Sequence, residues 1–400
     1  MVRWPVLGHN TCNKPMTADN ELTILLPLKD RAQFTYRWMS YANSIRFPFK
    51  VLIADGGADE TVPKVLSNKT NFPNVNYEYR RYPYDQTYAE FYSKMADALS
   101  RIKTPFVVMA DNDDFFIAEG LRANVEFLRA HLDYSSCSGQ IGVFWVTPSD
   151  ECSQSNRVYG KQIEYKWCSR TSPVIQETAT QRIGSKISAD RLTYYDVQRT
   201  EELKAKFETV RSLDLKNLYL VEFLLTFLAG IEGKIQRIDR LYLMRQWNSP
   251  DTTAGRHEEK FGDYWGQMLV ESWSDDFTKF LNMVAAALVE KDRISMEDAR
   301  DHVRKCYKTF VAPFIIQCLL AEPTVTTTMP IIARMVQRVV KLGPNSLTKR
   351  TLQKLYRRIP WISVNAVNGD EFFAYPSLMY RKDLKPIAKL LTQKPPVFDF

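Results

Sequence analysis

Most of the short motifs that identify nucleotide-binding and metal-binding proteins are missing from this 400-residue sequence. It contains neither GxGxxG nor GxxxxGK followed by Ser or Thr, so the signatures of the Rossmann dinucleotide fold and of the P-loop are absent. Its six cysteines include no CxxC pair, and its four histidines lie far apart. These absences argue against a structural zinc site and against a disulfide framework.

Long hydrophobic runs are missing too. No uncharged apolar run reaches the roughly 18 residues of a membrane span, and the longest candidate, Leu218 to Ile231, contains Glu222. Met1 to Asn20 holds no apolar core of signal-peptide length. We therefore expect a cytoplasmic protein.

Acidic residues are scarce in one part of the chain. Lys and Arg outnumber Asp and Glu by 54 to 46 overall, for a net charge of +8. Such an excess suits a polyanionic partner, such as nucleic acid, a membrane surface or a phosphorylated substrate. The segment 323–369 has eight Lys and Arg and no Asp or Glu, so the basicity belongs to this C-terminal segment.

The first third of the chain alternates between apolar runs and helical patterns. Four runs predict strands, namely Thr23–Leu28, Lys50–Ala54, Val75–Tyr79 and Phe106–Ala110. Three intervening stretches predict helices, namely Ala32–Ser44, Glu60–Ser67 and Tyr88–Lys103. This alternation predicts an α/β fold with a mixed, mostly parallel sheet and flanking helices.

The pattern continues less regularly and then becomes helical. Further helices are expected over 121–131, 201–210 and 218–229, strands over 140–146, 190–198 and 235–246, and irregular structure over 149–188 and 248–257. Beyond Gly262 we expect long helices over 265–291, 295–310, 330–342 and 347–358. The predicted organisation is an extension over 1–20, an α/β domain over 21–260 and a helical region over 261–400.

Aspartates gather where the predicted strands end, namely Asp30, Asp55, Asp111, Asp113 and Asp114. The carboxyl ends of parallel strands share one edge of a sheet, where ligands bind. Carboxylates so placed repel one another unless a cation or hydrogen-bond donors neutralise them. A hard divalent cation that bridges to a diphosphate would do so. Plain turn formation or helix capping is the alternative for these acids.

Three blocks of sequence together resemble the GT-A nucleotide-sugar glycosyltransferases, notably glycosyltransferase family 2. The stretch Val107–Asp114 (VVMADNDD) resembles the metal-binding motif of these enzymes, in which an apolar strand enters an Asp-x-Asp pattern. Thr23–Arg31 (TILLPLKDR) resembles the opening strand and its basic turn, and Val51–Asp59 (VLIADGGAD) the second-strand motif. The resemblance covers roughly residues 21–250 and is nearest to the bacterial surface-polysaccharide and capsule branch.

The resemblance implies roles for individual residues. The nucleotide-sugar site would consist of Pro27, Lys29, Arg31, Asp55, Gly56, Arg81, Lys94, Asp111 and Asn112. Within it, Asp55 would face the base and Asp111 would lie near the ribose, while Asp113 would hold Mn²⁺ or Mg²⁺ against the donor pyrophosphate. The family has an Asn or Arg near Lys94, and a solvated helix charge is the other interpretation of this lysine.

Transfer with inversion also needs a carboxylate base that takes the proton of the acceptor hydroxyl. Glu222 lies in an otherwise apolar helical pattern, where burial would raise its pKa toward neutrality. A buried ion pair with Arg240 or Arg245 is its structural alternative. Asp214 is the second candidate for the base, with a helix N-cap as its alternative.

A polar stretch after the last predicted strand offers further candidates. His257 could be an additional metal ligand or a solvated side chain, and Arg245 and Arg256 could approach the diphosphate. The segment Ser249–Gly255 could close over the donor as a lid, or it could be a linker. In Pro330–Lys341 an apolar stripe lies beside basic residues, which suits either an anionic membrane surface or packing on the catalytic domain.

The sequence therefore predicts a metal-assisted, inverting glycosyltransferase that moves a hexosyl or related sugar. The donor would be a nucleoside-diphosphate sugar, UDP-linked, and the acceptor a growing surface glycan or lipid-linked glycan. Two alternatives stay open, a nucleotidyltransferase and a basic nucleic-acid-binding protein. Leu26–Arg31 lacks the glycines that a nucleotidyltransferase loop would have, and no nucleic-acid-binding module is recognisable.

Overall fold

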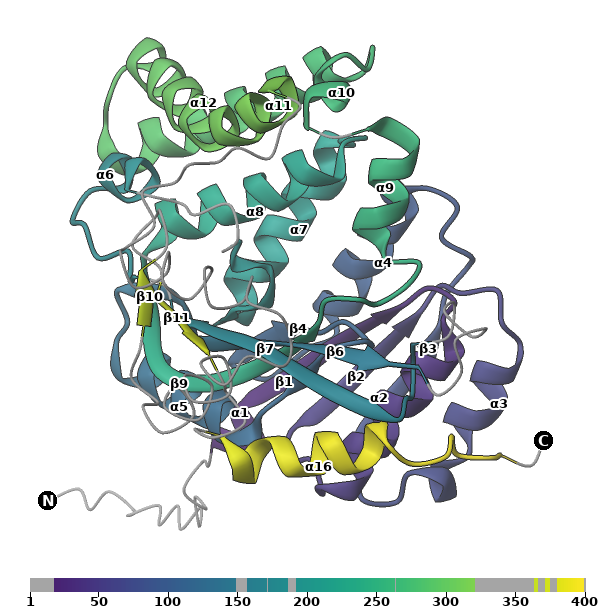
Figure 1. Ribbon diagram of the computed structural model, residues 1–400. Helices are drawn as coiled ribbons and strands as arrows, with labels where there is room; N and C mark the ends of the chain where they lie inside the picture. Colours follow the sequence, from purple (N-terminus) through teal and green to yellow (C-terminus); the bar gives the residue numbers. More distant parts are fainter. Residues whose placement is uncertain are drawn as a thin grey trace, which may run out of the picture.

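The computed structural model describes residues 18–148, 157–170, 172–185, 192–262, 264–320, 363–365, 371–374 and 380–398. Within these residues, eleven strands form one sheet, and helices cover both of its faces (Figure 1). The predicted α/β fold, with a mixed sheet and a helical C-terminal part, is confirmed.

Four parallel strands form the middle of the sheet in the order β3-β2-β1-β4. They are β1 (Leu22–Leu28), β2 (Lys50–Asp55), β3 (Tyr77–Arg81) and β4 (Phe106–Met109). All of β4 and nearly all of β1 and β2 is buried. Strands covered on both faces read as continuous apolar runs, which is why the sequence identifies them so readily.

A short strand, β8 (Val197–Arg199), connects this parallel centre to the outer strands. It is antiparallel both to β4 and to β6 (Tyr134–Thr147), so β6 runs in the same direction as β4. Because β9 (Lys234–Gln246) is parallel to β6, its carboxyl end lies at the same edge of the sheet. The other strands are β5 (Phe115–Phe116), which pairs with β9, and β7 (Gln162–Arg170), β11 (Glu371–Ala374) and β10 (Ser363–Asn365), which continue outward from β6.

Alternate side chains of the central strands enter two separate cores. Ile24 and Leu26 of β1 pack on one face of the sheet, against helices α2 (Ala32–Ser44), α3 (Thr61–Ser67) and α5 (Ala118–Ala130). The neighbouring Leu25 packs on the other face, under helices α4 (Tyr88–Ser100), α7 (Thr200–Leu213) and α8 (Leu218–Glu232). Side chains alternate along a strand, so each central strand contributes to both layers.

Helix α8 is apolar on nearly all sides because it is enclosed by other elements. Helices α11 (Trp273–Asp292) and α12 (Met296–Leu320) pack above it and share its core through residues such as Val284 and Leu288 (Figure 1). Three shorter helices are α1 (Ala18–Glu21), α6 (Ala179–Gly184) and α10 (Tyr264–Met268). The first helices of the C-terminal region therefore continue the core of the α/β part.

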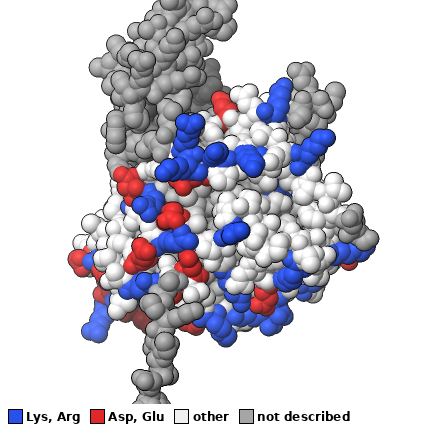
Figure 2. Space-filling view, turned by 90° about the horizontal axis from the view of Figure 1, so that it is seen from below, with Lys and Arg blue, Asp and Glu red and all other residues white. Residues whose placement is uncertain are grey.

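The last helix, α16 (Arg381–Leu391), covers the underside of β6 and β9 (Figure 1). Its buried residues Leu384, Ile387 and Leu391 meet Phe144 and Met244 in a third apolar core. Figure 2 looks at this underside, where Lys and Arg side chains are interspersed with Asp and Glu.

Two segments expected to be irregular contain regular structure. The span 149–188 includes β7, whose sequence Gln162-Ile163-Glu164-Tyr165 alternates between polar and apolar residues as a half-buried strand should. The expected loop 248–257 runs into helix α9 (Thr253–Phe261), which begins at the N-cap Thr252. In both segments the many polar residues obscured the periodic pattern of apolar residues that predicts a strand or a helix.

Some expectations lie beyond the described part of the chain. The two basic helices expected over 330–342 and 347–358 fall outside the described residues. Among the helices that the structure describes, none is long and apolar enough to span a bilayer.

The packing of α16 predicts a measurable cost for truncating its buried face. Ile387→Ala should lower the free energy of unfolding by about 2–4 kcal/mol, because it leaves a cavity under β6 and β9. Lys385→Ala on the exposed side of the same helix is the matched control and should change it by less than about 0.5 kcal/mol. Urea denaturation of both variants measures this difference, and equal stabilities would contradict the described packing.

Candidate active site

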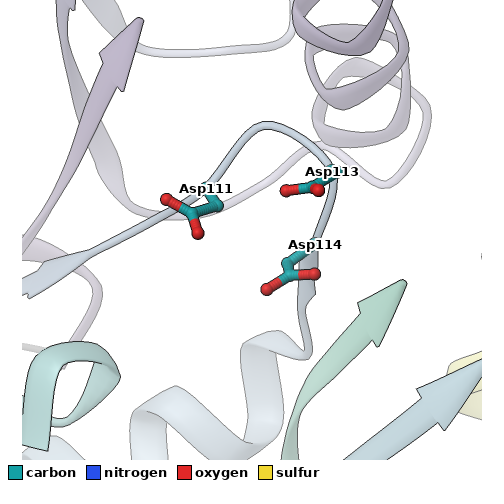
Figure 3. Close-up of side chains that lie close together, drawn as sticks. All are labelled: Asp111, Asp113 and Asp114. Carbon is teal, nitrogen blue, oxygen red and sulfur yellow. The ribbon is translucent and has the colours of Figure 1, made fainter. Parts of the chain in front are cut away.

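Three carboxylates meet at the carboxyl end of β4, where the chain turns toward β5. Asp111, Asp113 and Asp114 each direct an oxygen toward the others, and these oxygens lie within 4.8 Å of one another (Figure 3). Asp113 and Asp114 are almost wholly buried. The predicted strand-end cluster is therefore present for these three residues, and Asp114 belongs to it.

Burial and mutual repulsion shape the charge of this cluster. Burial raises the pKa of Asp111, and the charge of Asp113 raises it further. Burial likewise raises the pKa of Asp114 to about 7, although Arg245 opposes the shift. Burial also acts to raise the pKa of Asp113, but the charges of Arg31 and Arg37 and the hydrogen bonds from Arg31 and Ser249 together outweigh it, so the pKa falls below its usual value. Burial thus disfavours the ionised forms of Asp111 and Asp114, whereas the ionised form of Asp113 is favoured.

Two arginines from distant parts of the chain approach the cluster. Arg31 donates from Nη2 to Asp113 Oδ2 at 3.1 Å, and it also donates to the Ser249 hydroxyl. Arg245 of β9 donates from Nε to Asp114 Oδ2 at 2.8 Å, and its guanidinium lies over the Tyr195 ring. The loop after β1 and the end of β9 therefore meet across the carboxylates.

The backbone after β1 is bent to present Arg31. Asp30 and Arg31 both adopt left-handed conformations, with φ of 58° and 56°, which non-glycine residues rarely do. Asp30 Oδ1 accepts a hydrogen bond from the Ala58 amide at 2.8 Å, which ties this turn to the loop after β2. A Cβ at Gly57 would lie 2.6 Å from the Asp30 nitrogen, so only glycine permits this approach.

The three aspartates have the chemistry of a divalent cation site. Hard cations such as Mg²⁺ and Mn²⁺ bind carboxylate oxygens, and three converging oxygens supply a partial ligand set. Burial is the main cause of the raised pKa values of Asp111 and Asp114, the neighbouring carboxylates add to it, and a bound cation would favour the ionised forms of both. The residues present therefore fit a metal ion.

A buried arginine, Arg37 of α2, fixes the backbone of the cluster. Its Nη2 donates to the Asp113 carbonyl at 2.8 Å, and its Nη1 donates to Gln246 Oε1 at 2.7 Å. Burial lowers the pKa of Arg37 to about 10. The sequence pattern places this arginine on a helix but does not reveal that it is buried, so its positioning role was not predicted.

Asp55 lies at the end of β2 with all of its oxygens engaged. Oδ2 accepts from the Tyr79 hydroxyl and from Arg81 Nη1, both at 2.6 Å, and Oδ1 accepts from the Gly57 amide at 2.9 Å. The structure thus brings together Asp55 and Arg81, two residues that were each predicted for the nucleotide-sugar site. The neighbouring Gly56 is packed so tightly that a Cβ would lie 2.4 Å from the Asp85 carboxylate.

The remaining predicted donor-site residues lie around this edge. Pro27 lies in β1 beyond Leu25, the last residue of β1 that pairs with β4. The N–H that proline lacks is therefore not needed for a hydrogen bond between these two strands. Lys29 lies over the ring of the partly exposed Tyr84, 5.2 Å from its centroid. Asn112 is buried and donates to the Thr35 hydroxyl at 3.1 Å, so its amide is engaged with α2.

Lys94 differs from both expectations for it. It is 4 % exposed and forms an ion pair with the buried Asp85, and it donates to the Leu28 carbonyl at 2.9 Å. Burial lowers the pKa of Lys94 and raises the pKa of Asp85. This lysine is neither a solvated charge nor open to a phosphate, but supports the end of β1 from α4.

The two base candidates have different surroundings. Glu222 is only partly exposed, and no described residue forms a hydrogen bond or ion pair with it. Burial raises its pKa to about 7, with opposing influence from Arg245 and a further increase from Asp111. Asp214 instead ends α7 in a left-handed conformation and forms an exposed ion pair with Lys216 at 2.6 Å. The N-cap of α8 is Asn217, so the capping alternative for Asp214 was wrong.

His257 lies apart from the three carboxylates. It is buried in α9, with Nδ1 3.1 Å from the Tyr88 hydroxyl and Nε2 3.2 Å from Gln267 Oε1. These side chains engage both ring nitrogens, and the cluster of potential metal ligands in the described part of the chain contains the three aspartates without His257. Arg256 is exposed on the same helix.

The fold can be compared with known proteins. No family model and no curated protein matches the sequence. A crystal structure of S. aureus TarS 1-349 with UDP is similar at a TM-score of 0.43 and 15% identity, over 73% of this chain and 72% of that chain. The same fragment with UDP-GlcNAc gives 0.43 and 15%, over 73% of each. The mannosyltransferase PcManGT from Pyrobaculum calidifontis, with GDP-Man and Mn2+, gives 0.34 and 11%, over 75% and 80%.

The buried pair predicts a large effect of removing one partner. Lys94→Met should lower the free energy of unfolding by about 3–5 kcal/mol, because it leaves the Asp85 carboxylate buried and unpaired. Adding Asp85→Asn should recover part of this loss. The exposed pair of Arg101 and Asp97 is the control, and Arg101→Met should cost less than about 1 kcal/mol. Chemical denaturation measures both free energies of unfolding. Equal losses for Lys94→Met and Arg101→Met would contradict the buried ion pair of Lys94 and Asp85.

Proposed function

We propose that this protein is a metal-assisted glycosyltransferase that uses a nucleoside-diphosphate sugar, UDP-linked, and transfers the sugar with inversion to a growing surface glycan. The observation that carries this proposal is the convergence of Asp111, Asp113 and Asp114 at the carboxyl end of β4. The charges of Arg245 and of Asp111 in the cluster both act on the carboxylate of Glu222. The order of the three sequence blocks that resemble glycosyltransferase family 2 agrees with this arrangement.

The donor diphosphate would lie beside the aspartate cluster. Asp113, with Asp111 and Asp114, would hold Mn²⁺ or Mg²⁺. When bound, such an ion acts as a Lewis acid that neutralises charge on a departing diphosphate. Arg31 and Arg245 already lie at the carboxylates and carry positive charge to the same region. Asp55 and Arg81, at the end of β2, would face the nucleotide base.

Glu222 is the proposed base of the transfer step. Its carboxylate takes the proton from the acceptor hydroxyl as that oxygen forms a bond to the anomeric carbon. The bond from this carbon to the diphosphate oxygen breaks at the same time, and its electron pair leaves with the diphosphate. A pKa of about 7 suits this role, because the group is largely ionised just above neutral pH and is still basic. Asp214 is the second candidate.

The first prediction from this proposal concerns donor binding. UDP with Mn²⁺ should raise the melting temperature of the protein, because a ligand that binds only the folded state stabilises it. Asp113→Asn should lose the Mn²⁺-dependent part of this increase, whereas the exposed Asp133→Asn should keep it. Differential scanning fluorimetry with and without Mn²⁺ provides the measurement. An unchanged Mn²⁺-dependent increase in Asp113→Asn would refute the metal assignment.

The second prediction concerns pH. Release of UDP from a panel of UDP-sugars should rise with pH through about 7 and then level off, because only the ionised Glu222 accepts a proton. Glu222→Gln should slow this release by about 100-fold or more and leave the UDP-induced increase in melting temperature intact. Retained turnover in Glu222→Gln would contradict Glu222 as the base. Asp214 would then be the candidate, and Asp214→Asn would test it in the same assay.

The same pKa shift predicts an opposite effect on stability. Between the ordinary glutamate pKa and about 7, the folded protein binds more protons at Glu222 than the unfolded chain, so rising pH costs folding stability in this window. Glu222→Gln removes that cost and should therefore melt higher than the wild type at pH 8, with a smaller difference at pH 5. A lower melting temperature of the variant at pH 8 would contradict the raised pKa.

A further inference from the structure

A tyrosine outside the predicted site, Tyr195, contacts two charged groups at the aspartate cluster. Its hydroxyl donates to Asp111 Oδ2, and Arg245 Nη2 donates to the same hydroxyl at 3.3 Å. The Arg245 guanidinium also lies over the Tyr195 ring, 4.6 Å from its centroid. Tyr195 therefore links Arg245 to Asp111, and neither donor binding nor the transfer step described above gives it a role.

The direction of these two hydrogen bonds follows from the groups that make them. A guanidinium has only N–H donors, and a tyrosine hydroxyl has a single hydrogen. Because the hydroxyl oxygen accepts from Arg245, its hydrogen is left for Asp111. An O–H donor stabilises the ionised form of a carboxylate, which is the form that a cation binds. Tyr195 thus favours the metal-binding form of Asp111.

Asp111 depends on this tyrosine more than its two neighbours do. Asp113 and Asp114 each accept a hydrogen bond from an arginine. In the described part of the chain, Tyr195 is the only hydrogen-bond donor to the Asp111 carboxylate. A carboxylate has two oxygens with about four lone-pair positions, so one bond from Tyr195 fixes its orientation and leaves acceptor sites for a cation.

The backbone of Tyr195 is itself held on both sides. Tyr195 ends the short helical turn η3 (Thr193–Tyr195), and β8 begins two residues later. The Thr193 amide donates to the Thr226 hydroxyl of α8 at 3.2 Å, and Gln198 Nε2 donates to the Thr193 carbonyl at 2.9 Å. A side chain supported in this way can hold its partner in one geometry.

We propose that Tyr195 is a positioning residue of the cation site, which holds the Asp111 carboxylate through its hydroxyl and is itself oriented by Arg245. This assignment rests on the proposed function, in which Asp111 helps to hold Mn²⁺ or Mg²⁺. Removing a group that orients a metal-binding side chain typically lowers metal affinity by roughly 10- to 100-fold.

The test is Mn²⁺ binding to the full chain, with and without UDP, followed by the electron paramagnetic resonance signal of the free ion. Tyr195→Phe keeps the aromatic ring and removes the hydroxyl, and it should weaken Mn²⁺ binding by about 10-fold or more. Tyr77→Phe is the matched control, because its hydroxyl donates to the Leu66 carbonyl at the start of β3. This control should leave the Mn²⁺ affinity unchanged.

A second background separates positioning of Asp111 from a general effect on the structure. If Tyr195 acts through Asp111, Tyr195→Phe should have little further effect on Mn²⁺ binding once Asp111→Asn is present. An equal loss of affinity in both backgrounds would overturn the proposal, because the hydroxyl would then act elsewhere. An unchanged Mn²⁺ affinity in Tyr195→Phe alone would overturn it too.

Failure of the proposed function gives a different pattern. Wild-type protein that binds no Mn²⁺, with or without UDP, rejects the cation site and the role of Tyr195 together. Mn²⁺ binding that Tyr195→Phe leaves unchanged retains the cation site and rejects the role of Tyr195 alone. Mn²⁺ binding that depends on Tyr195, without any effect of UDP on the melting temperature, supports Tyr195 and rejects the nucleotide-sugar donor.

Discussion

Three carboxylates confined to one buried turn repel one another, and much of the surrounding structure serves to keep them together. Arg31 and Arg245 provide charge from the ends of β1 and β9, while Arg37 holds the Asp113 carbonyl from below. These three arginines come from separate elements, so the cluster ties the parallel centre of the sheet to its outer strands. An arrangement with so much concentrated charge is costly for a fold, which is the usual sign of a functional site.

The same topology explains why β4, β6 and β9 end at one edge of the sheet. Because β8 is antiparallel to both β4 and β6, the strands on either side of it end together. Under the proposed function, the loops after β1, β2 and β4 would form the nucleotide side of this edge. Glu222 belongs to α8, in the layer above the sheet, and the charges of Arg245 and Asp111 both act on its carboxylate.

Much of this could be predicted from sequence where the physical cause is local. Buried parallel strands read as apolar runs, so β1, β2 and β4 were found, and α2 was found from its helical spacing. Turn-forming aspartates after those strands marked the site. The environments of Lys94, Arg37 and His257 could not be predicted, because each depends on a partner that only the tertiary fold brings near. Nothing in the sequence shows whether a lysine on a helix faces water or a buried aspartate.

The central claim is that the strand-end aspartates hold a divalent cation beside a nucleotide diphosphate. Anomalous diffraction from crystals grown with Mn²⁺ and UDP tests it most directly, since it locates manganese independently of activity. The account predicts a manganese peak within bonding distance of Asp113 and of Asp111 or Asp114, with the UDP phosphates beside it. Well-defined UDP with no manganese peak, and with Arg31 and Arg245 still paired to the carboxylates, would contradict it.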